Sequence, residues 1–249
     1  MTFADRAEAG RRLAAKLADY AGRPDLIVLG IPRGGVVVAG EVARALGAPL
    51  DVFLSRKLGV PGQEELALGA LASGGVRVID RDLTRELNIS DAQVDRITEQ
   101  VRAELERRER VYRDGRAALP LEGKTVLLVD DGIATGSSTM AAIQTLRHLR
   151  PASLVLAVPV GPASTCKRLR EHVDDLVCVY TPERFYAIGQ FYQDFSQVTD
   201  NQVVEILRRA ARPGDSTPDA AASPDADGAV DEASRESFPA SDAPGWIQD

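Results

Sequence analysis

Two aspartates, Asp130 and Asp131, stand side by side at the end of the apolar segment VLLV. The chain continues GIATGSST, so a run of small and hydroxyl residues follows the acids directly. Ligands of open α/β sheets bind beyond the carboxyl ends of the strands, which is where a strand ending in VLLVDD would place both carboxylates. Each carboxylate can accept a hydrogen bond from one hydroxyl of a vicinal diol. The pair therefore indicates a sugar-binding site.

The residues after the acids add an anion site. Gly136 allows a tight turn, and Ser137, Ser138 and Thr139 offer hydroxyls and backbone amides at the start of a predicted helix, an arrangement suited to phosphate. A diol site next to a phosphate site describes a ribose 5-phosphate. The stretch has neither the Gly-Lys-Ser/Thr of a Walker A loop nor a G-x-G-x-x-G pattern. A strand followed by an Asx turn and a helix cap is the simpler alternative, but it accounts for only one Asp and one Ser.

The whole stretch VLLVDDGIATGSST resembles the phosphoribosyl-diphosphate binding motif of the type I phosphoribosyltransferases. The resemblance implies that Asp130 and Asp131 bind the ribose hydroxyls. It also implies that the following loop surrounds the 5-phosphate. The residues of this predicted phosphate loop are Ala134, Thr135, Gly136, Ser137, Ser138 and Thr139.

A second segment, GIPRGGVVVAGEVARALG from Gly30 to Gly47, again reads as strand, glycine turn and helix. It predicts another anion site, to which Arg33 adds a fixed charge. The segment resembles the family's diphosphate loop, which implies that Arg33 and the amides of Gly34 and Gly35 bind the leaving group. The resemblance also implies a cis peptide at Pro32–Arg33. A plain turn at PRGG is the alternative.

A third segment, LSRKLGVPGQEELALGALASGG from Leu54 to Gly75, is predicted to begin on a strand with Arg56 and Lys57 and to continue as a long loop through Gly, Pro and Gly. It resembles the mobile loop that closes over the active site in this family, most nearly that of adenine phosphoribosyltransferases. Closure would exclude water from an oxocarbenium-like centre. Lys57 or Arg56 would then offset charge on the diphosphate, and Glu64 or Glu65 is the candidate acid/base residue. For Arg56, pairing with a local carboxylate is the alternative.

The segment TPERFYAIGQFYQDF, Thr181 to Phe195, resembles the part of 6-oxopurine phosphoribosyltransferases in which an aromatic ring stacks on the base. Phe185 or Tyr186 would be that ring, unless these aromatics simply belong to the core. Two departures count against hypoxanthine or guanine as acceptor. The sequence AVPVGP lacks the lysine that those enzymes carry after the fifth strand, and Ala134 stands where they have an acid.

Elements that would position these residues alternate along the chain. Apolar segments at 26–32, 49–58, 76–80, 125–130, 153–160 and 175–180 alternate with helical ones. The pattern predicts an α/β fold with a mostly parallel sheet of about five strands flanked by helices. A small hood is expected from the segment after Phe185, helped by the N-terminus or by a long helix. That helix is predicted to start at Ser90 or Asp91 and to end at Gly115, with an ion-paired, solvated face of interleaved Glu and Arg, Arg108 among them.

The net charge of −7 is confined to the end of the chain. Residues 211–249 hold nine acids and two bases, whereas the preceding 210 residues hold 28 of each. The neutral main part argues against nucleic-acid binding, which favours basic excess. We predict a phosphoribosyltransferase domain over 1–210 and an acidic, disordered tail over 211–249, with a docking segment around Phe238 and Trp246 as the alternative.

The sequence has no apolar run long enough for a membrane helix and no signal-peptide pattern, so a cytoplasmic protein with reduced thiols at Cys166 and Cys178 is expected. No metal-ligating cluster of side chains is predicted, and a homodimer stays open. The resemblance implies a pentosyltransferase of nucleotide metabolism that moves 5-phosphoribosyl to a base-like nitrogen, with Mg²⁺ bridging the diphosphate oxygens. One alternative is a regulatory protein that binds phosphoribosyl diphosphate without turnover. Another is an enzyme that uses a phosphorylated pentose, with water or phosphate as acceptor.

Overall fold

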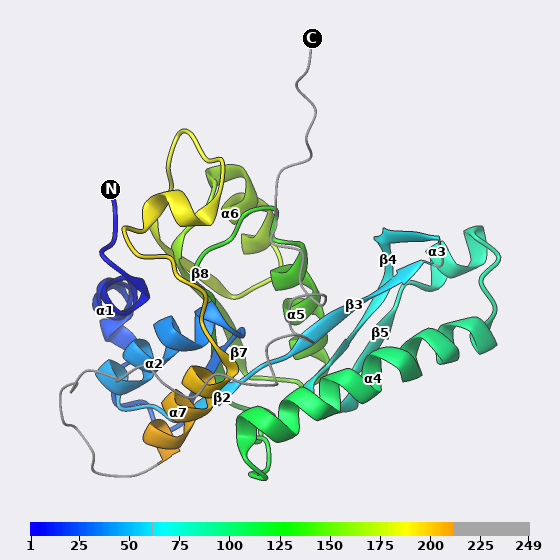
Figure 1. Ribbon diagram of the computed structural model, residues 1–249, viewed down its shortest axis with the longest axis horizontal. Coiled ribbons are helices and arrows are strands. Elements are labelled where there is room, and N and C mark those ends of the chain that lie inside the picture. Colours follow the sequence, from blue (N-terminus) through cyan, green and yellow to red (C-terminus); the bar gives the residue numbers. More distant parts are fainter. Residues whose placement is uncertain (61, 212–249) are drawn as a thin grey trace.

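A five-stranded parallel sheet forms the centre of the protein in its computed structural model, which describes residues 1–60 and 62–211 (Figure 1). The strands lie in the order β2-β1-β6-β7-β8, so the middle strand is the one that leads to the two aspartates. The parallel α/β architecture predicted from the alternation of segments is confirmed. The strands are β1 (Leu26–Gly30), β2 (Leu50–Val52), β6 (Thr125–Val129), β7 (Ser153–Val160) and β8 (Asp175–Tyr180).

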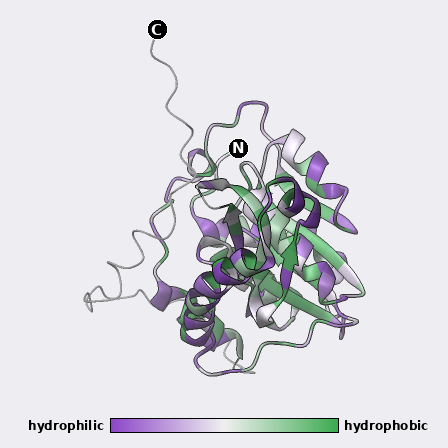
Figure 2. Cartoon of the chain, turned by 90° about the vertical axis from the view of Figure 1, so that its right-hand side faces the viewer, coloured by the Kyte–Doolittle hydropathy of each residue, from purple (hydrophilic) through white to green (hydrophobic). Residues whose placement is uncertain are grey.

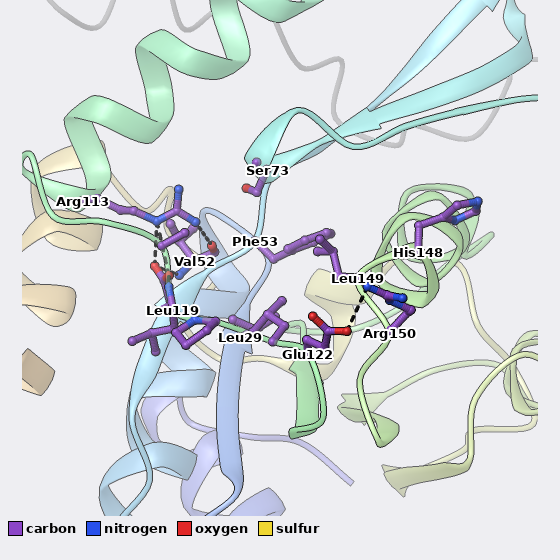
Figure 3. A pocket seen from close by; sticks show the side chains of 15 residues that line it. Leu29, Val52, Phe53, Ser73, Arg113, Leu119, Glu122, His148, Leu149 and Arg150 are labelled. Carbon is purple, nitrogen blue, oxygen red and sulfur yellow. Dashed lines mark hydrogen bonds and ion pairs between the residues drawn. The ribbon is translucent and has the colours of Figure 1, made fainter.

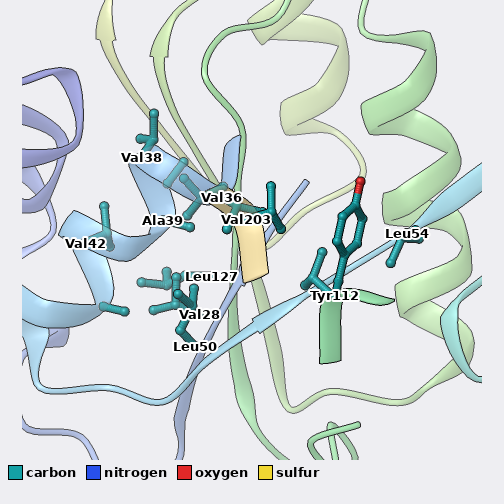
Figure 4. Packing of buried hydrophobic residues seen from close by; sticks show 14 of the residues in the cluster. Val28, Val36, Val38, Ala39, Val42, Leu50, Leu54, Tyr112, Leu127 and Val203 are labelled. Carbon is teal, nitrogen blue, oxygen red and sulfur yellow. The ribbon is translucent and has the colours of Figure 1, made fainter. Parts of the chain in front are cut away.

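Successive residues of a strand point to opposite sides of the sheet, and the residues of β1 and β6 are buried on both sides. Helices therefore cover both faces of this sheet. Leu26 and Val28 pack with α1 (Arg6–Lys16), α2 (Gly34–Leu46) and α7 (Asp200–Ala211) (Figures 1 and 4). Ile27 and Leu29 pack in a second cluster with α5 (Ser137–His148) and α6 (Ala163–Arg170). Short 3-10 turns lie at η1 (Ala18–Tyr20), η2 (Ser73–Gly75) and η3 (Ile188–Phe191).

A second, antiparallel sheet projects from the first and consists of β3 (Ser55–Val60), β4 (Gln63–Ala72) and β5 (Arg77–Ile79) (Figure 1). The long loop predicted after the strand at 49–58 is therefore wrong in its secondary structure, and that single predicted strand is divided between β2 and β3, which belong to different sheets. The segment 76–80, expected in the main sheet, instead forms the edge of this small one. Apolar residues on one face of the hairpin, such as Leu58 and Leu68, are buried against the long helix, and this burial explains why strands form.

The long helix, α4 (Asp91–Arg113), starts with a capping box between Ser90 and Gln93, as the sequence predicts. The short helix α3 (Arg81–Glu86) precedes it along the chain. The long helix lies along the small sheet and contacts α7 (Figure 1). Its outer face is hydrophilic, whereas the strands of the main sheet are hydrophobic (Figure 2). One detail of the predicted solvated face is wrong, because the Arg108 residue is buried, at 7% exposed, and its side chain forms an ion pair with Glu104.

The hood is built from both ends of the domain. Phe3, Phe191 and Tyr192 are buried together with Val160, and the amide of Phe3 donates to the carbonyl of Phe191 over 2.8 Å. The predicted contribution of the N-terminus is thus confirmed. The long helix packs instead on the small sheet and on α7. Over the part of the chain that the structure describes, no helix is long and apolar enough to span a membrane.

The predicted tail, with Phe238 and Trp246, lies outside the described residues from Arg212 on.

Candidate active site

The two predicted loops meet at the carboxyl edge of the main sheet. β6 ends at Val129 between β1 and β7, so Asp130 and Asp131 emerge at the middle of that edge. The glycine turn that opens α2 lies directly against them. A Cβ atom at Gly34 would come within 1.9 Å of Asp131 Oδ2, and one at Gly35 within 2.9 Å of Asp130 Oδ1. Only glycine fits this approach, so segments about a hundred residues apart form one site.

The two carboxylates are close together and largely enclosed. Burial, followed by repulsion from Asp131, raises the pKa of Asp130 well above its ordinary value. Burial also raises the pKa of Asp131, although Arg6 opposes the shift through an ion pair of 2.7 Å to Asp131 Oδ2. The backbone amide of Asp131 donates to Asp130 Oδ1 over 2.9 Å. The pair thus holds more negative charge than a buried site stabilises by itself, which favours a ligand with hydroxyl donors.

The predicted phosphate loop is hydrogen-bonded to α6. Thr165 Oγ1 donates to the carbonyl of Ala134 over 2.9 Å, and Arg168 donates to the carbonyl of Thr135. Gly136 adopts the left-handed conformation with φ of 75° and leads into α5. Thr135, Ser137 and Ser138 are exposed, whereas Thr139 is buried. The first amides of a helix lack intrahelical acceptors, so this end of α5 can bind an anion.

Arg33 lies at the N-terminus of α2, after a cis peptide between Pro32 and Arg33. The cis geometry predicted at this bond is present. The side chain of Arg33 is 17% exposed, and its Nη1 lies 3.9 Å from Asp200 Oδ1. The buried Tyr112 donates its hydroxyl to the same Asp200 oxygen over 2.7 Å. The turn at Arg33, Gly34 and Gly35, which we call the predicted diphosphate turn, is therefore connected to α4 and α7 through Asp200.

The remaining predicted residues lie on the small sheet and on the hood. Lys57 is exposed on β3, and Arg56 is half-buried beside it, where burial and then Arg108 lower the pKa of Arg56. Glu64 and Glu65 belong to β4, but their side chains lie outside the described part of the structure. β3 and β4 contact α5. The structure thus ties the small sheet to the helix that carries the phosphate loop.

The two candidate stacking residues differ in environment. The ring of Phe185 packs on Phe191, with centroids 5.5 Å apart and the planes inclined by 31°, and it borders the hood cluster. Tyr186 is 78% exposed. A shallow pocket beside them is lined by Tyr180, Thr181, Pro182, Glu183, Arg184 and Phe191. Of the two rings, Tyr186 is the one with a face available to a base.

Another cavity, of about 370 Å³, lies near β2 and contains none of the predicted residues (Figure 3). Apolar side chains such as Phe53, Leu119 and Leu149 line it. Its charged groups pair with each other, Arg113 with Asp51 over 3.0 Å and Arg150 with Glu122 over 2.9 Å. Because these charges are already compensated, the cavity lacks the chemistry of the acid pair.

Three residues around the acid pair, two of which contact Asp131, are missed by the sequence analysis. Arg6 pairs with Asp131, the hydroxyl of Tyr192 donates to the Asp131 carbonyl over 2.5 Å, and Phe195 stacks on Arg6. Arg6 precedes Asp131 by 125 residues and lies in an unremarkable helical turn. No local sequence pattern predicts such a contact, because it arises only from tertiary packing.

The model of the phosphoribosyl transferase domain matches residues 4–196, which include the acid pair, the predicted phosphate loop and the predicted diphosphate turn at Arg33, Gly34 and Gly35. The chain belongs to this family. Proteins of two Mycobacterium tuberculosis strains, named as candidate phosphoribosyl transferases, are each 47% identical over 210 residues. The match covers 84% of this chain and 47% of each relative, so the chain spans about half the length of the curated relatives it matches.

The crystal structure of the TT1426 protein from Thermus thermophilus is similar along its whole length. The two chains are 42% identical with a TM-score of 0.77, over 85% of this chain and 100% of that one. The chain thus carries a phosphoribosyl transferase domain with the fold of the TT1426 structure.

Proposed function

We propose that the protein is a phosphoribosyltransferase that binds 5-phosphoribosyl 1-diphosphate and transfers the phosphoribosyl group to a base-like nitrogen, releasing diphosphate. The observation that carries the proposal is the contact between the Gly34–Gly35 turn and the acid pair. It brings a diol site and an anion site together at the carboxyl edge of the sheet. The phosphate loop begins three residues beyond Asp131, so all three parts of the sugar diphosphate have a matching surface.

Each part of the site has a role in this proposal. Asp130 and Asp131 accept hydrogen bonds from the ribose hydroxyls, and their charge stabilises a cationic sugar carbon in the transition state. Ala134 to Thr139 bind the 5-phosphate at the start of α5. Gly34, Gly35 and Arg33 bind the diphosphate. Arg33 can exchange its 3.9 Å pairing with Asp200 for a phosphate oxygen, because a pairing at that distance is weak.

The small sheet and the hood complete the active site in the proposal. Lys57 lies on an exposed face of β3 and would offset charge on the departing diphosphate. Glu65 is the proposed acid/base residue on the same hairpin. Tyr186, with Phe185 beside it, would stack on the acceptor base.

Magnesium fits this site as a companion of the substrate. The described residues contain no group of three or more His, Cys, Asp or Glu arranged to hold a metal. The acid pair provides two carboxylates, one already paired with Arg6. The diphosphate oxygens would therefore supply most of the ligands, and the bound ion would neutralise charge on the leaving group.

The first experiment measures binding and turnover separately. Isothermal titration with phosphoribosyl diphosphate and Mg²⁺ should show one site, and release of diphosphate should require an added purine or pyrimidine base. Absence of binding would refute the proposal. Binding without release, across a panel of bases, would favour the alternative of a regulatory protein. Release that needs no base would favour water or phosphate as acceptor.

A further inference from the structure

Arg6 makes a buried, multiply bonded contact with one of the two candidate ribose-binding acids. Its Nε lies 2.7 Å from Asp131 Oδ2, and its Nη1 donates to the carbonyl of Ser196 over 2.8 Å. The side chains of Arg6 and Asp131 are only 11% and 13% exposed. An ion pair so enclosed has a defined geometry, unlike the surface pairs elsewhere on α1.

Aromatic residues of the hood fix the guanidinium in place. The Cζ atom of Arg6 lies 3.9 Å from the ring centroid of Phe195 and 6.0 Å from that of Tyr192. Tyr192 also donates its hydroxyl to the carbonyl of Asp131 over 2.5 Å. The first turn of α1 and the segment 192–196 thus converge on Asp131 from two sides.

The diphosphate turn touches the same pair. A Cβ atom at Gly34 would meet Asp131 Oδ2 at 1.9 Å and Arg6 Nε at 2.7 Å. The Arg6–Asp131 pair therefore lies between the hood and the proposed diphosphate site.

We propose that Arg6 is a positioning residue, which directs the Asp131 carboxylate so that it can accept a hydrogen bond from a sugar hydroxyl. The inference rests on the proposed function, because it assigns Asp131 to the ribose. Burial raises the pKa of Asp131 and so disfavours its charge, and Arg6 opposes this shift through the ion pair. Arg6 Nε binds Asp131 Oδ2, so Oδ1 stays available to a ligand.

The test compares Arg6→Gln and Arg6→Lys with a matched control on the same helix. Arg12→Gln removes a similar arginine that pairs with Glu8 and stacks on Phe3, away from the acids. Affinity for phosphoribosyl diphosphate with Mg²⁺ is measured by calorimetry from about pH 6 to 8, and thermal unfolding shows whether each variant is folded.

Arg6→Gln should weaken binding at least about tenfold at neutral pH, because it leaves a buried carboxylate without its cation. The loss should grow as the pH falls, since Asp131 without Arg6 takes up a proton at a higher pH. The groups that face Asp131 are Arg6 from α1, its neighbour Asp130 and Tyr192 from the hood. Arg6→Lys should bind with intermediate affinity, and Arg12→Gln should match the wild type.

A second measurement needs no ligand. Carboxyl carbon NMR titration should show a higher pKa for Asp131 in Arg6→Gln than in the wild type. If the wild type fails to bind the sugar diphosphate, the proposed function is refuted, and the titration alone decides whether Arg6 controls Asp131. An unchanged Asp131 titration overturns the inference about Arg6. So does wild-type affinity in Arg6→Gln, and tighter binding would mean that Arg6 competes with the ligand.

Discussion

Two acidic sites next to the main sheet differ in how their charge is compensated. Asp51, the middle residue of β2, accepts two bonds from Arg113 at 3.0 and 3.3 Å and one from the amide of Leu119 at 3.1 Å. Within the described residues, Asp130 and Asp131, after β6, share a single ion pair, through Arg6. The first site is complete within the protein, whereas the second carries surplus charge. This difference separates a carboxylate that stabilises the fold from a pair available to a ligand.

The largest effect on stability is expected when the complete site is broken. Asp51→Ala should reduce the free energy of unfolding by about 3 kcal/mol or more, because it leaves the buried Arg113 with fewer acceptors. Denaturant unfolding measures this change. The matched control is Asp114→Asn, which affects an exposed pair with Arg208 and should change stability by about 0.5 kcal/mol or less. If both variants cost the same, Asp51 is not the structural carboxylate described above.

Breaking the incomplete site should affect binding instead. Asp130→Asn combined with Asp131→Asn should weaken binding of phosphoribosyl diphosphate at least about a hundredfold, since two charge-assisted hydrogen bonds are lost. The fold should remain intact, because the substitution removes two like charges that burial disfavours. Calorimetry and thermal unfolding measure the two effects.

Asp25→Asn is the control for this double variant. Asp25 precedes β1, at the opposite end of the sheet, where it pairs with Arg23. Its substitution should leave the affinity unchanged. Wild-type affinity in the double variant would instead refute the ribose assignment.

The same contrast explains what the sequence could predict. The acid pair and the glycine turn were predictable because each follows a short apolar strand whose end must reach the same sheet edge. Their contact also needs glycine at 34 and 35, which the sequence shows. The small sheet was not predictable in this way, since Gly and Pro near residues 59–62 suggested a loop. The strands on either side depend on burial against α4, which no local pattern reveals.

The arginines that pair with these buried carboxylates were equally hard to predict from the sequence. Arg6 and Asp131 are 125 residues apart, and Arg113 and Asp51 are 62 apart. The charge pattern of α4 suggested a solvated face, yet Arg108 and Arg113 are buried. Periodicity predicts which side of a helix is apolar, but not which arginine reaches a carboxylate on another element.

The pH dependence of stability should also distinguish the acid pair from a compensated carboxylate, although the expected effect is smaller. Asp130 has a raised pKa in the folded protein, so its ionisation costs stability as the pH rises from the ordinary carboxyl range through the folded pKa. Asp130→Asn should therefore exceed the wild type in stability at about pH 8, and the difference should shrink as the pH falls towards about 4. One proton limits the slope to about 1.4 kcal/mol per pH unit.

Asp25 provides the opposite sign. Hydrogen bonds from Arg23 and Thr125 lower the pKa of Asp25 to about 2. Its contribution to stability is present above the ordinary range and is lost only as the pH falls towards that value. Relative to the wild type, the free energy of unfolding should therefore be higher in Asp130→Asn and lower in Asp25→Asn at neutral pH, as unfolding curves at several pH values would show. A difference between the wild type and Asp130→Asn that grows on acidification would contradict the raised pKa of Asp130.

The smallest expected effect concerns a carboxylate between these extremes. Asp200 accepts the hydroxyl of the fully buried Tyr112 over 2.7 Å, while Arg33 lies 3.9 Å from the same oxygen (Figure 4 shows Tyr112). Tyr112→Phe should cost about 1 kcal/mol of stability, the net value of one hydrogen bond. With that donor lost, Asp200 should hold Arg33 more strongly and weaken diphosphate binding by a few fold, which a competition assay with diphosphate would measure. A stability loss without any change in diphosphate affinity would show that Asp200, like Asp51, serves the fold alone.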